Sequence, residues 1–195
     1  MLSCAAIPGW ITNEELHFLL VWTLNTALVN RNALEIGSYK GKTTVGMATI
    51  YRLLDSGRRV TAVDPGSNQW YGGTEQTFDI LRDNISAYEL DRWVSLAQCE
   101  PNLNEFHLSD QFGLVYIDGE HSLKSIRRDF WFGVDHLEDD GFILIHDDCC
   151  DTFPDVWLHC RQISERYSYR FLGTVGSMSA FQKLHTSKIA PPPII

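Results

Sequence analysis

Five short apolar runs recur along the chain, and segments long enough to form helices separate them. The runs occupy residues 33–36, 60–63, 93–96, 114–117 and 142–145. Short continuous apolar runs of this kind are typical of parallel strands that are buried on both faces of a sheet. The alternation therefore predicts an α/β fold with a doubly wound, mostly parallel, Rossmann-like sheet.

Polar and apolar positions between these runs predict the helices. Thr12 followed by Glu15 forms a capping box, and apolar residues at helical spacing continue over 16–28. The spacing also predicts a helix from Leu123 through Leu137, which Gly141 is expected to end, and a later helix over 155–166.

The C-terminal pattern predicts a hairpin, with strands over 169–175 and 178–183 and a turn at Gly176 and Ser177. The sheet should therefore end in an antiparallel strand. One domain is expected over residues 1–185, because 195 residues build one core. A loose tail is expected over 186–195, where three consecutive prolines occur.

Charge and composition exclude several classes of protein. The net charge of −9 disfavours a partner that binds through phosphates, such as nucleic acid. Apolar stretches fall short of the roughly 20 residues that a membrane helix needs. The N-terminus lacks the features of a signal peptide, so the protein is expected to be cytoplasmic, with its five cysteines as thiols.

The loop after the first predicted strand is rich in glycine, which suits close approach of a ligand. It lacks the G-x-G-x-x-G fingerprint of dinucleotide binding. Gly41-Lys42-Thr43 matches the end of a P-loop, but only three residues separate Gly37 from Gly41, where a P-loop has four. The pattern Glu35-x-Gly37-x-x-x-Gly41 resembles motif I of the class I S-adenosylmethionine (SAM) methyltransferases.

An acid at the end of the second predicted strand supports this resemblance. Asp64 stands where a carboxylate can accept hydrogen bonds from both hydroxyls of a ribose. The resemblance implies a sheet order of 3-2-1-4-5-7-6 and SAM as the cofactor. The cofactor residues that it implies are Glu35, Gly37, Ser38, Tyr39, Gly41, Thr43, Asp64, Cys99 and Glu100.

Acidic and imidazole side chains follow the fourth and fifth predicted strands. Asp118, Glu120 and His121 follow the fourth, and the run His146-Asp147-Asp148 follows the fifth. Strand ends that meet at one edge of a sheet would bring these groups together, so a cation or hydrogen bonds must offset their repulsion. A hard divalent cation such as Mg²⁺ would fit.

These two segments resemble the small-molecule O-methyltransferases, which include catechol-type and macrocin-type enzymes. The resemblance implies metal ligands at Asp118, Asp147 and Asp148, with Mg²⁺ or Mn²⁺ as the ion, and a general base at His121 beside Asp118 in the catalytic site. His146 departs from both types. An imidazole there is either a ligand for manganese or iron, or a side chain that points into the core.

The acceptor is expected to be a small molecule with a hydroxyl oxygen, and neither nucleic acid nor a membrane is expected as a partner. The first helix or a second subunit, as in a homodimer, is expected to close the site, and Trp70 and Tyr71 could form a lid. Two other functions compete: a P-loop-like NTPase, and a module that binds SAM without turnover.

Overall fold

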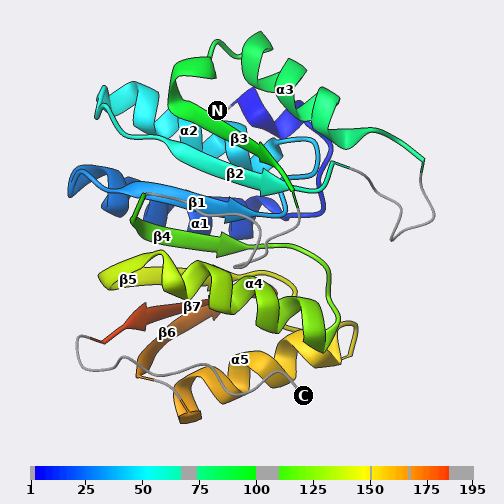
Figure 1. Cartoon of the computed structure of the whole chain (residues 1–195), viewed down its shortest axis with the longest axis vertical. Helices are drawn as coiled ribbons and strands as arrows, with labels where there is room; N and C mark the ends of the chain where they lie inside the picture. Colours follow the sequence, from blue (N-terminus) through cyan, green and yellow to red (C-terminus); the bar gives the residue numbers. More distant parts are fainter. Residues whose placement is uncertain (1–2, 67–73, 100–109, 150, 167, 185–195) are drawn as a thin grey trace.

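The computed structural model describes residues 3–66, 74–99, 110–149, 151–166 and 168–184. Seven strands form one sheet in the order β3-β2-β1-β4-β5-β7-β6 (Figure 1). Neighbours from β3 to β5 pair in parallel, and β7 runs antiparallel to both β5 and β6. The strands are β1 Asn32–Ile36, β2 Val60–Asp64, β3 Val94–Gln98, β4 Phe112–Ile117, β5 Leu137–Ile145, β6 Tyr169–Val175 and β7 Met178–Lys183. The predicted fold class and strand order are confirmed.

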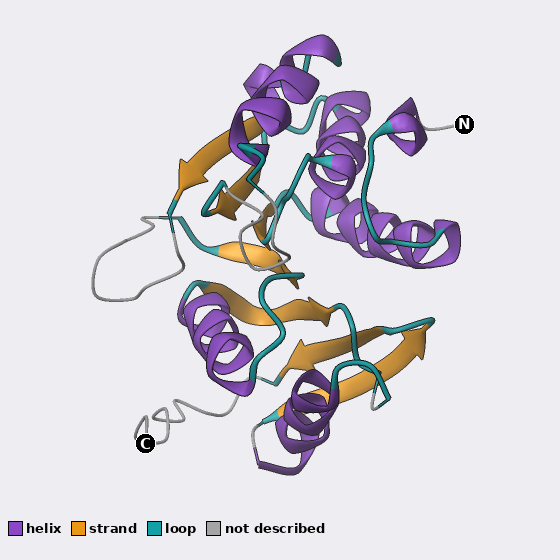
Figure 2. Cartoon of the chain, turned by 90° about the vertical axis from the view of Figure 1, so that its right-hand side faces the viewer, coloured by secondary structure: helices purple, strands orange, loops and turns teal. Residues whose placement is uncertain are grey.

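Helices cover both faces of the sheet (Figure 2). Successive residues of a strand point to opposite faces of the sheet, so the core consists of two buried clusters, one on each face. Ala33 and Leu114 pack in the first cluster, and Leu34 and Val115 pack in the second. The first cluster lies under α1 Asn13–Leu28, α2 Lys42–Leu54 and α3 Thr77–Ala87, and the second lies under α4 Leu123–Asp135 and α5 Pro154–Arg166. Two short 3₁₀ turns, η1 Ser3–Ala6 and η3 Asp91–Trp93, complete the described elements.

The capping box is present at the start of α1. The backbone N–H of Thr12 donates to Glu15 Oε2 at 2.9 Å, and the backbone N–H of Glu15 donates to Thr12 Oγ1 at 3.2 Å. The hairpin strands have the predicted bounds, with Gly176 and Ser177 in the turn.

The prediction that Gly141 ends the fourth helix is wrong. Helix α4 ends at Asp135, and Leu137 is already the first residue of β5, where it pairs with Phe112. The ring of His136 contributes to this ending through a hydrogen bond between its Nδ1 and the Phe132 carbonyl at 2.8 Å. Leu137 kept the helical spacing because it packs into the same buried cluster as the apolar face of α4.

Trp93 lies in η3 rather than in the third strand. The predicted tail over 186–195 and the Trp70 and Tyr71 lid lie outside the described residues. Among the described residues, none of the helices has both the length and the apolar composition of a membrane span.

Candidate active site

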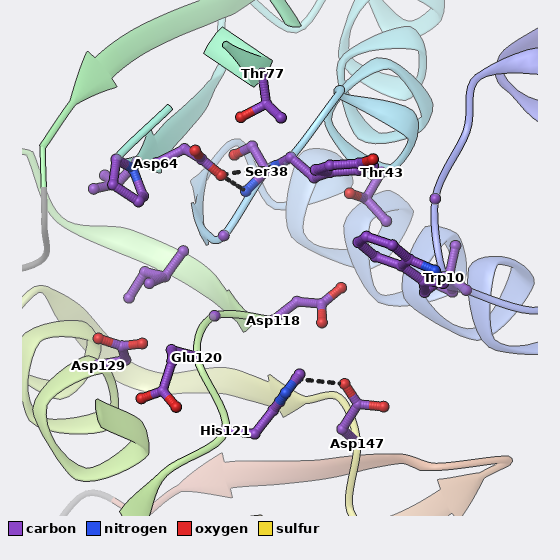
Figure 3. A pocket seen from close by; sticks show the side chains of 18 of the residues that line it. Trp10, Ser38, Thr43, Asp64, Thr77, Asp118, Glu120, His121, Asp129 and Asp147 are labelled. Carbon is purple, nitrogen blue, oxygen red and sulfur yellow. Dashed lines mark hydrogen bonds and ion pairs between the residues drawn. The ribbon is translucent and has the colours of Figure 1, made fainter. Parts of the chain in front are cut away.

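A cavity of about 460 Å³ opens at the carboxyl ends of β1, β2, β4 and β5. Ligands of open α/β sheets bind at this edge, because the loops that follow parallel strands converge there. Asp64, Ser38 and Thr43 lie along one side of the cavity with Trp10 beyond Thr43, and Asp118 lies on the other side, near His121 and Asp147 (Figure 3).

The glycine loop needs its glycines for two separate reasons. Gly37 has a φ of +86°, and a Cβ on it would lie 2.5 Å from the carbonyl carbon of Asp118. Gly41 has a φ of +89°, and a Cβ there would lie 2.6 Å from Leu81 Cδ1. Only glycine combines this backbone conformation with such close approach. The loop after β1 can therefore lie directly against the end of β4.

Asp64 fixes the conformation of this loop. Its Oδ2 accepts hydrogen bonds at 2.8 Å from the backbone N–H groups of both Ser38 and Tyr39, and its Oδ1 accepts one at 2.7 Å from Gly66 N–H. Burial raises the pKa of Asp64, and the three N–H groups oppose that shift. The carboxylate lines the cavity while it holds the loop.

Glu35 lies behind the loop and outside the cavity lining. Its Oε2 accepts hydrogen bonds from the hydroxyls of Thr44 and, at 3.2 Å, of Ser38. The side chain is fully buried, and burial raises its pKa to about 7. Glu35 therefore supports residues that face the cavity and does not itself reach a ligand.

The other predicted cofactor residues fall into three groups. Those that line the cavity are Gly37, Ser38, Tyr39, Thr43 and Asp64. Gly41 and Cys99 lie outside the lining, although the Cys99 N–H donates to the Asp64 carbonyl at 3.1 Å. Glu100 lies outside the described residues.

The acidic and imidazole groups gather on the opposite wall, as the strand ends predict. Asp118, His121 and Asp147 each offer a ligand atom, and these atoms lie within 4.8 Å of one another. His121 Nε2 lies 2.7 Å from Asp147 Oδ2, and the two side chains face each other in Figure 3. The hydroxyl of Tyr116 donates to Asp118 Oδ2 at 2.8 Å.

His146 lies beneath this group with its side chain 2% exposed. Its Nδ1 is 3.2 Å from Asp118 Oδ1 and 3.4 Å from Asp147 Oδ2, and its Nε2 is 3.4 Å from Glu15 Oε2. Burial lowers the pKa of His146, but the carboxylates of Asp118 and Asp147 outweigh that effect and raise it to about 11. A buried imidazolium thus lies among three carboxylates.

The pKa of Asp147 shifts in the opposite direction to that of His146. Burial would raise its pKa, but hydrogen bonds from His121 and His146 hold it well below its usual range. Hydrogen bonds from imidazoles therefore supply much of the compensation for which the sequence suggested a cation.

Asp148, which the sequence predicted as a third metal ligand, has its hydrogen-bond partners outside the cluster. Its Oδ2 accepts hydrogen bonds from the Arg161 guanidinium at 2.8 Å and from the hydroxyl of Ser179. It belongs neither to the cavity lining nor to the described group that could hold a metal, in which His121 is the third member. The sequence could not reveal this, because α5 and β7 supply the partners that draw Asp148 away.

The segment before α1 also lines the cavity, and no motif in the sequence pointed to this. Trp10 is 68% exposed, and its ring stacks on Tyr39 with the ring centroids 4.6 Å apart. Lys42, the first residue of α2, also lines the cavity. The only available signal was a tryptophan two residues before a helix cap.

The glycine loop, the acid after β2 and the cluster after β4 and β5 lie in the part of the chain that a family model matches. A model described as a methyltransferase domain matches residues 34–148, which is more than half of the chain. The chain belongs to the methyltransferase domain family. This assignment decides between the two interpretations of the glycine loop, and the P-loop interpretation is set aside.

Solved structures of methyltransferases share the fold. An O-methyltransferase from Bacillus cereus, in complex with S-adenosylhomocysteine (SAH), is 22% identical with a TM-score of 0.62, and the match covers 93% of this chain and 86% of that one. The O-methyltransferase NovP is 14% identical with a TM-score of 0.70, covering 87% and 79%. The O-methyltransferase TomG from Streptomyces achromogenes, in complex with SAM, is 12% identical with a TM-score of 0.63, covering 86% and 80%. No curated protein matches this methyltransferase.

Proposed function

We propose that this methyltransferase transfers the methyl group of SAM to a hydroxyl oxygen of a small molecule. The observation that carries the proposal is a single cavity with a rigid glycine loop on one side and Asp118, His121 and Asp147 on the other. One side suits a nucleoside cofactor, and the other suits an acceptor that must lose a proton.

The cofactor would lie along the glycine loop. Asp64 accepts from three backbone N–H groups, which leaves about one of its roughly four lone-pair sites, on Oδ1, to accept from a ribose hydroxyl. Ser38 and Thr43 offer hydroxyls, and Gly37 allows the cofactor to approach the backbone. The positive sulfonium would be attracted by Asp118 and Asp147.

His121 would act as the general base. The acceptor O–H would give its proton to the imidazole nitrogen that does not face Asp147, and the oxygen would form a bond to the methyl carbon while the carbon–sulfur bond breaks. SAH would leave as the neutral thioether. Asp147 would orient the ring through the 2.7 Å contact and stabilise the imidazolium that forms.

In a second form of the mechanism, Asp118, Asp147 and the imidazole of His121 would hold a divalent ion, and the ion would replace His121 as the group that activates the acceptor hydroxyl. Two carboxylates and one imidazole suit Mn²⁺ better than Mg²⁺. The ion would supply positive charge that lowers the pKa of an acceptor hydroxyl.

Mn²⁺ titration followed by electron paramagnetic resonance tests the metal site. Asp147→Asn should weaken the binding of Mn²⁺, and Asp148→Asn should leave it unchanged. An equal loss of Mn²⁺ affinity in both variants would show that Asp148 is also a metal ligand.

The first experiment is a calorimetric titration of the protein with SAH, repeated with ATP present in excess. We expect micromolar binding of SAH that ATP leaves unchanged. Binding of ATP without binding of SAH would reject the proposal. Binding of SAH with no methyl transfer to any member of a broad panel of phenols and hydroxy acids would favour a module that binds SAM without turnover.

A further inference from the structure

Lys42 differs in its environment from the other cationic side chains around the cavity. Arg128 Nε contacts Asp129 Oδ1 at 2.8 Å, and His121 contacts Asp147 at 2.7 Å. Lys42 lines the same cavity, half-buried, and makes no hydrogen bond or ion pair with any residue that the structure describes. Its ammonium group is therefore available to a ligand.

The stem of Lys42 is held in place by the segment before α1. A Cβ on Gly9 would lie 3.0 Å from Lys42 Cδ and 3.2 Å from its Cβ, so the Gly9 backbone rests directly on the lysine stem. Pro8, Trp10 and Ile11 from the same segment line the cavity beside it. A partly ordered lysine stem loses less conformational entropy when its ammonium binds an anion.

The charge on the rest of the cavity wall shows where an anion could bind. Five carboxylates line the cavity: Asp64, Asp118, Glu120, Asp129 and Asp147. They would repel a ligand carboxylate, since like charges a few ångströms apart disfavour each other. Among the described lining residues, Lys42 is the cation without an acidic partner, so a carboxylate is favoured beside it.

We infer that Lys42 binds a ligand carboxylate and so fixes the direction in which the ligand lies in the cavity. This inference rests on the proposed function, and two sources can supply the carboxylate: the amino-acid end of SAM, or an acceptor that is itself a carboxylic acid. In either case the ligand's anionic end lies at Lys42, and its reacting part lies toward Asp118 and His121.

Lys40 provides a matched control in the same loop. Its ammonium contacts Glu75 Oε2 at 2.7 Å, and it lies outside the cavity lining. Lys42→Met keeps an unbranched stem against Gly9 and removes the charge, and Lys40→Met removes a charge that is paired with Glu75 and belongs to a residue outside the cavity lining. Thermal melting of both variants checks that folding is retained.

Calorimetry with two nucleosides tests the cofactor as the source. SAH carries the carboxylate, and 5′-methylthioadenosine lacks it. We expect Lys42→Met to weaken SAH binding by about 10- to 100-fold, which is the usual contribution of a charge-assisted hydrogen bond. Binding of 5′-methylthioadenosine should be unchanged, and Lys40→Met should bind both ligands as the wild type does.

A second pair of probes tests the acceptor as the source. The protein saturated with SAH is titrated with 4-hydroxybenzoate and with its uncharged methyl ester. Normal SAH binding by Lys42→Met, with loss of 4-hydroxybenzoate binding alone, would assign the carboxylate to the acceptor. A Lys42→Met variant that matches the wild type with all four probes overturns the inference and leaves the proposed function intact. A wild type that binds neither nucleoside overturns both.

Discussion

At the scale of single residues, His121 would accept the proton as the proposed base, and Asp147 would hold its ring in position. His121 has the nitrogen that can take a proton, and Asp147 lies 2.7 Å from its other nitrogen. Phe153 packs on the imidazole with ring centroids 4.0 Å apart, which limits its rotation. An imidazole held on two sides is oriented before the acceptor arrives, and this lowers the entropic part of the barrier.

His121→Ala should lower kcat by about 10² to 10⁴, because general-base catalysis typically contributes that much, while SAH affinity changes little. Single-turnover methyl transfer and SAH titration measure the two quantities separately. His17→Ala is the control, since His17 is an exposed residue on α1. Turnover near the wild-type rate in His121→Ala, or a defect confined to SAH affinity, would contradict the assignment.

Glu35 should make stability depend on pH. Burial raises its pKa from 4.5 to about 7, so between these values the folded protein holds a proton that the unfolded chain has released. The stability that this provides is complete below about pH 4.5 and is lost as the pH rises to about 7. From pH 5 to pH 7.5, the wild type should lose about 2–3 kcal/mol of unfolding free energy relative to Glu35→Gln. Urea unfolding at both pH values measures this, and parallel behaviour of the two proteins would refute it.

At the scale of elements, Glu15 joins three parts of the fold. It caps α1 through Thr12, its Oε1 accepts hydrogen bonds from the N–H and hydroxyl of Ser177 at 2.7 and 2.8 Å, and its Oε2 faces His146. Burial would raise the pKa of Glu15, but hydrogen bonds from Ser177 and Thr12 lower it to about 2. The start of α1 and the β6–β7 turn therefore help to position the residue beneath Asp118 and Asp147.

Gly176 is needed in that turn because of Glu15. It has a φ of +58°, and a Cβ on it would lie 2.8 Å from the carboxyl carbon of Glu15. Gly57 has a similar φ of +68° and no atom within 4 Å of such a Cβ. Gly57→Ala should cost about 1–2 kcal/mol from backbone strain alone, and Gly176→Ala roughly 1–3 kcal/mol more because of the overlap. Equal losses in urea unfolding would show that Glu15 moves aside freely.

At the scale of the whole molecule, the fold was more predictable than the site. Strands buried on both faces must be apolar throughout, so β1, β2 and β4 were visible as apolar runs. The hairpin was visible from its turn residues, Gly176 and Ser177. The residues after the strands were visible for a similar reason, since topology brings those ends together.

What the sequence could not predict depends on contacts between distant segments. The direction of Asp148 is set by Arg161 and Ser179, and the supporting role of Glu35 follows from the hydroxyls that α2 and the glycine loop present to it. Likewise, the segment before α1 lines the cavity because the stacking of Trp10 on Tyr39 brings it there. Spacing along the chain contains no information on any of these contacts.

Trp10 should report on cofactor binding. Its largely exposed ring lines the cavity, so a bound ligand should change its contact with water and hence its fluorescence. Addition of SAH should alter the tryptophan emission, and Trp10→Phe should remove most of that change while it keeps the stack on Tyr39. Trp157→Phe, on α5 and outside the cavity lining, should respond as the wild type does. An unaltered response in Trp10→Phe would place the reporter elsewhere.

The bond between Glu15 and Ser177 joins residues 162 positions apart, and this affects how the protein is made. During synthesis α1 leaves the ribosome well before the β6–β7 turn that holds Glu15. Ser177 of the hairpin turn binds Glu15, and Glu15 lies beside His146 beneath the cavity. The environment of His146 is therefore complete only after the hairpin has docked against α1. Gain of activity should therefore be a late event in folding, and chains that stop before the hairpin should release no active enzyme.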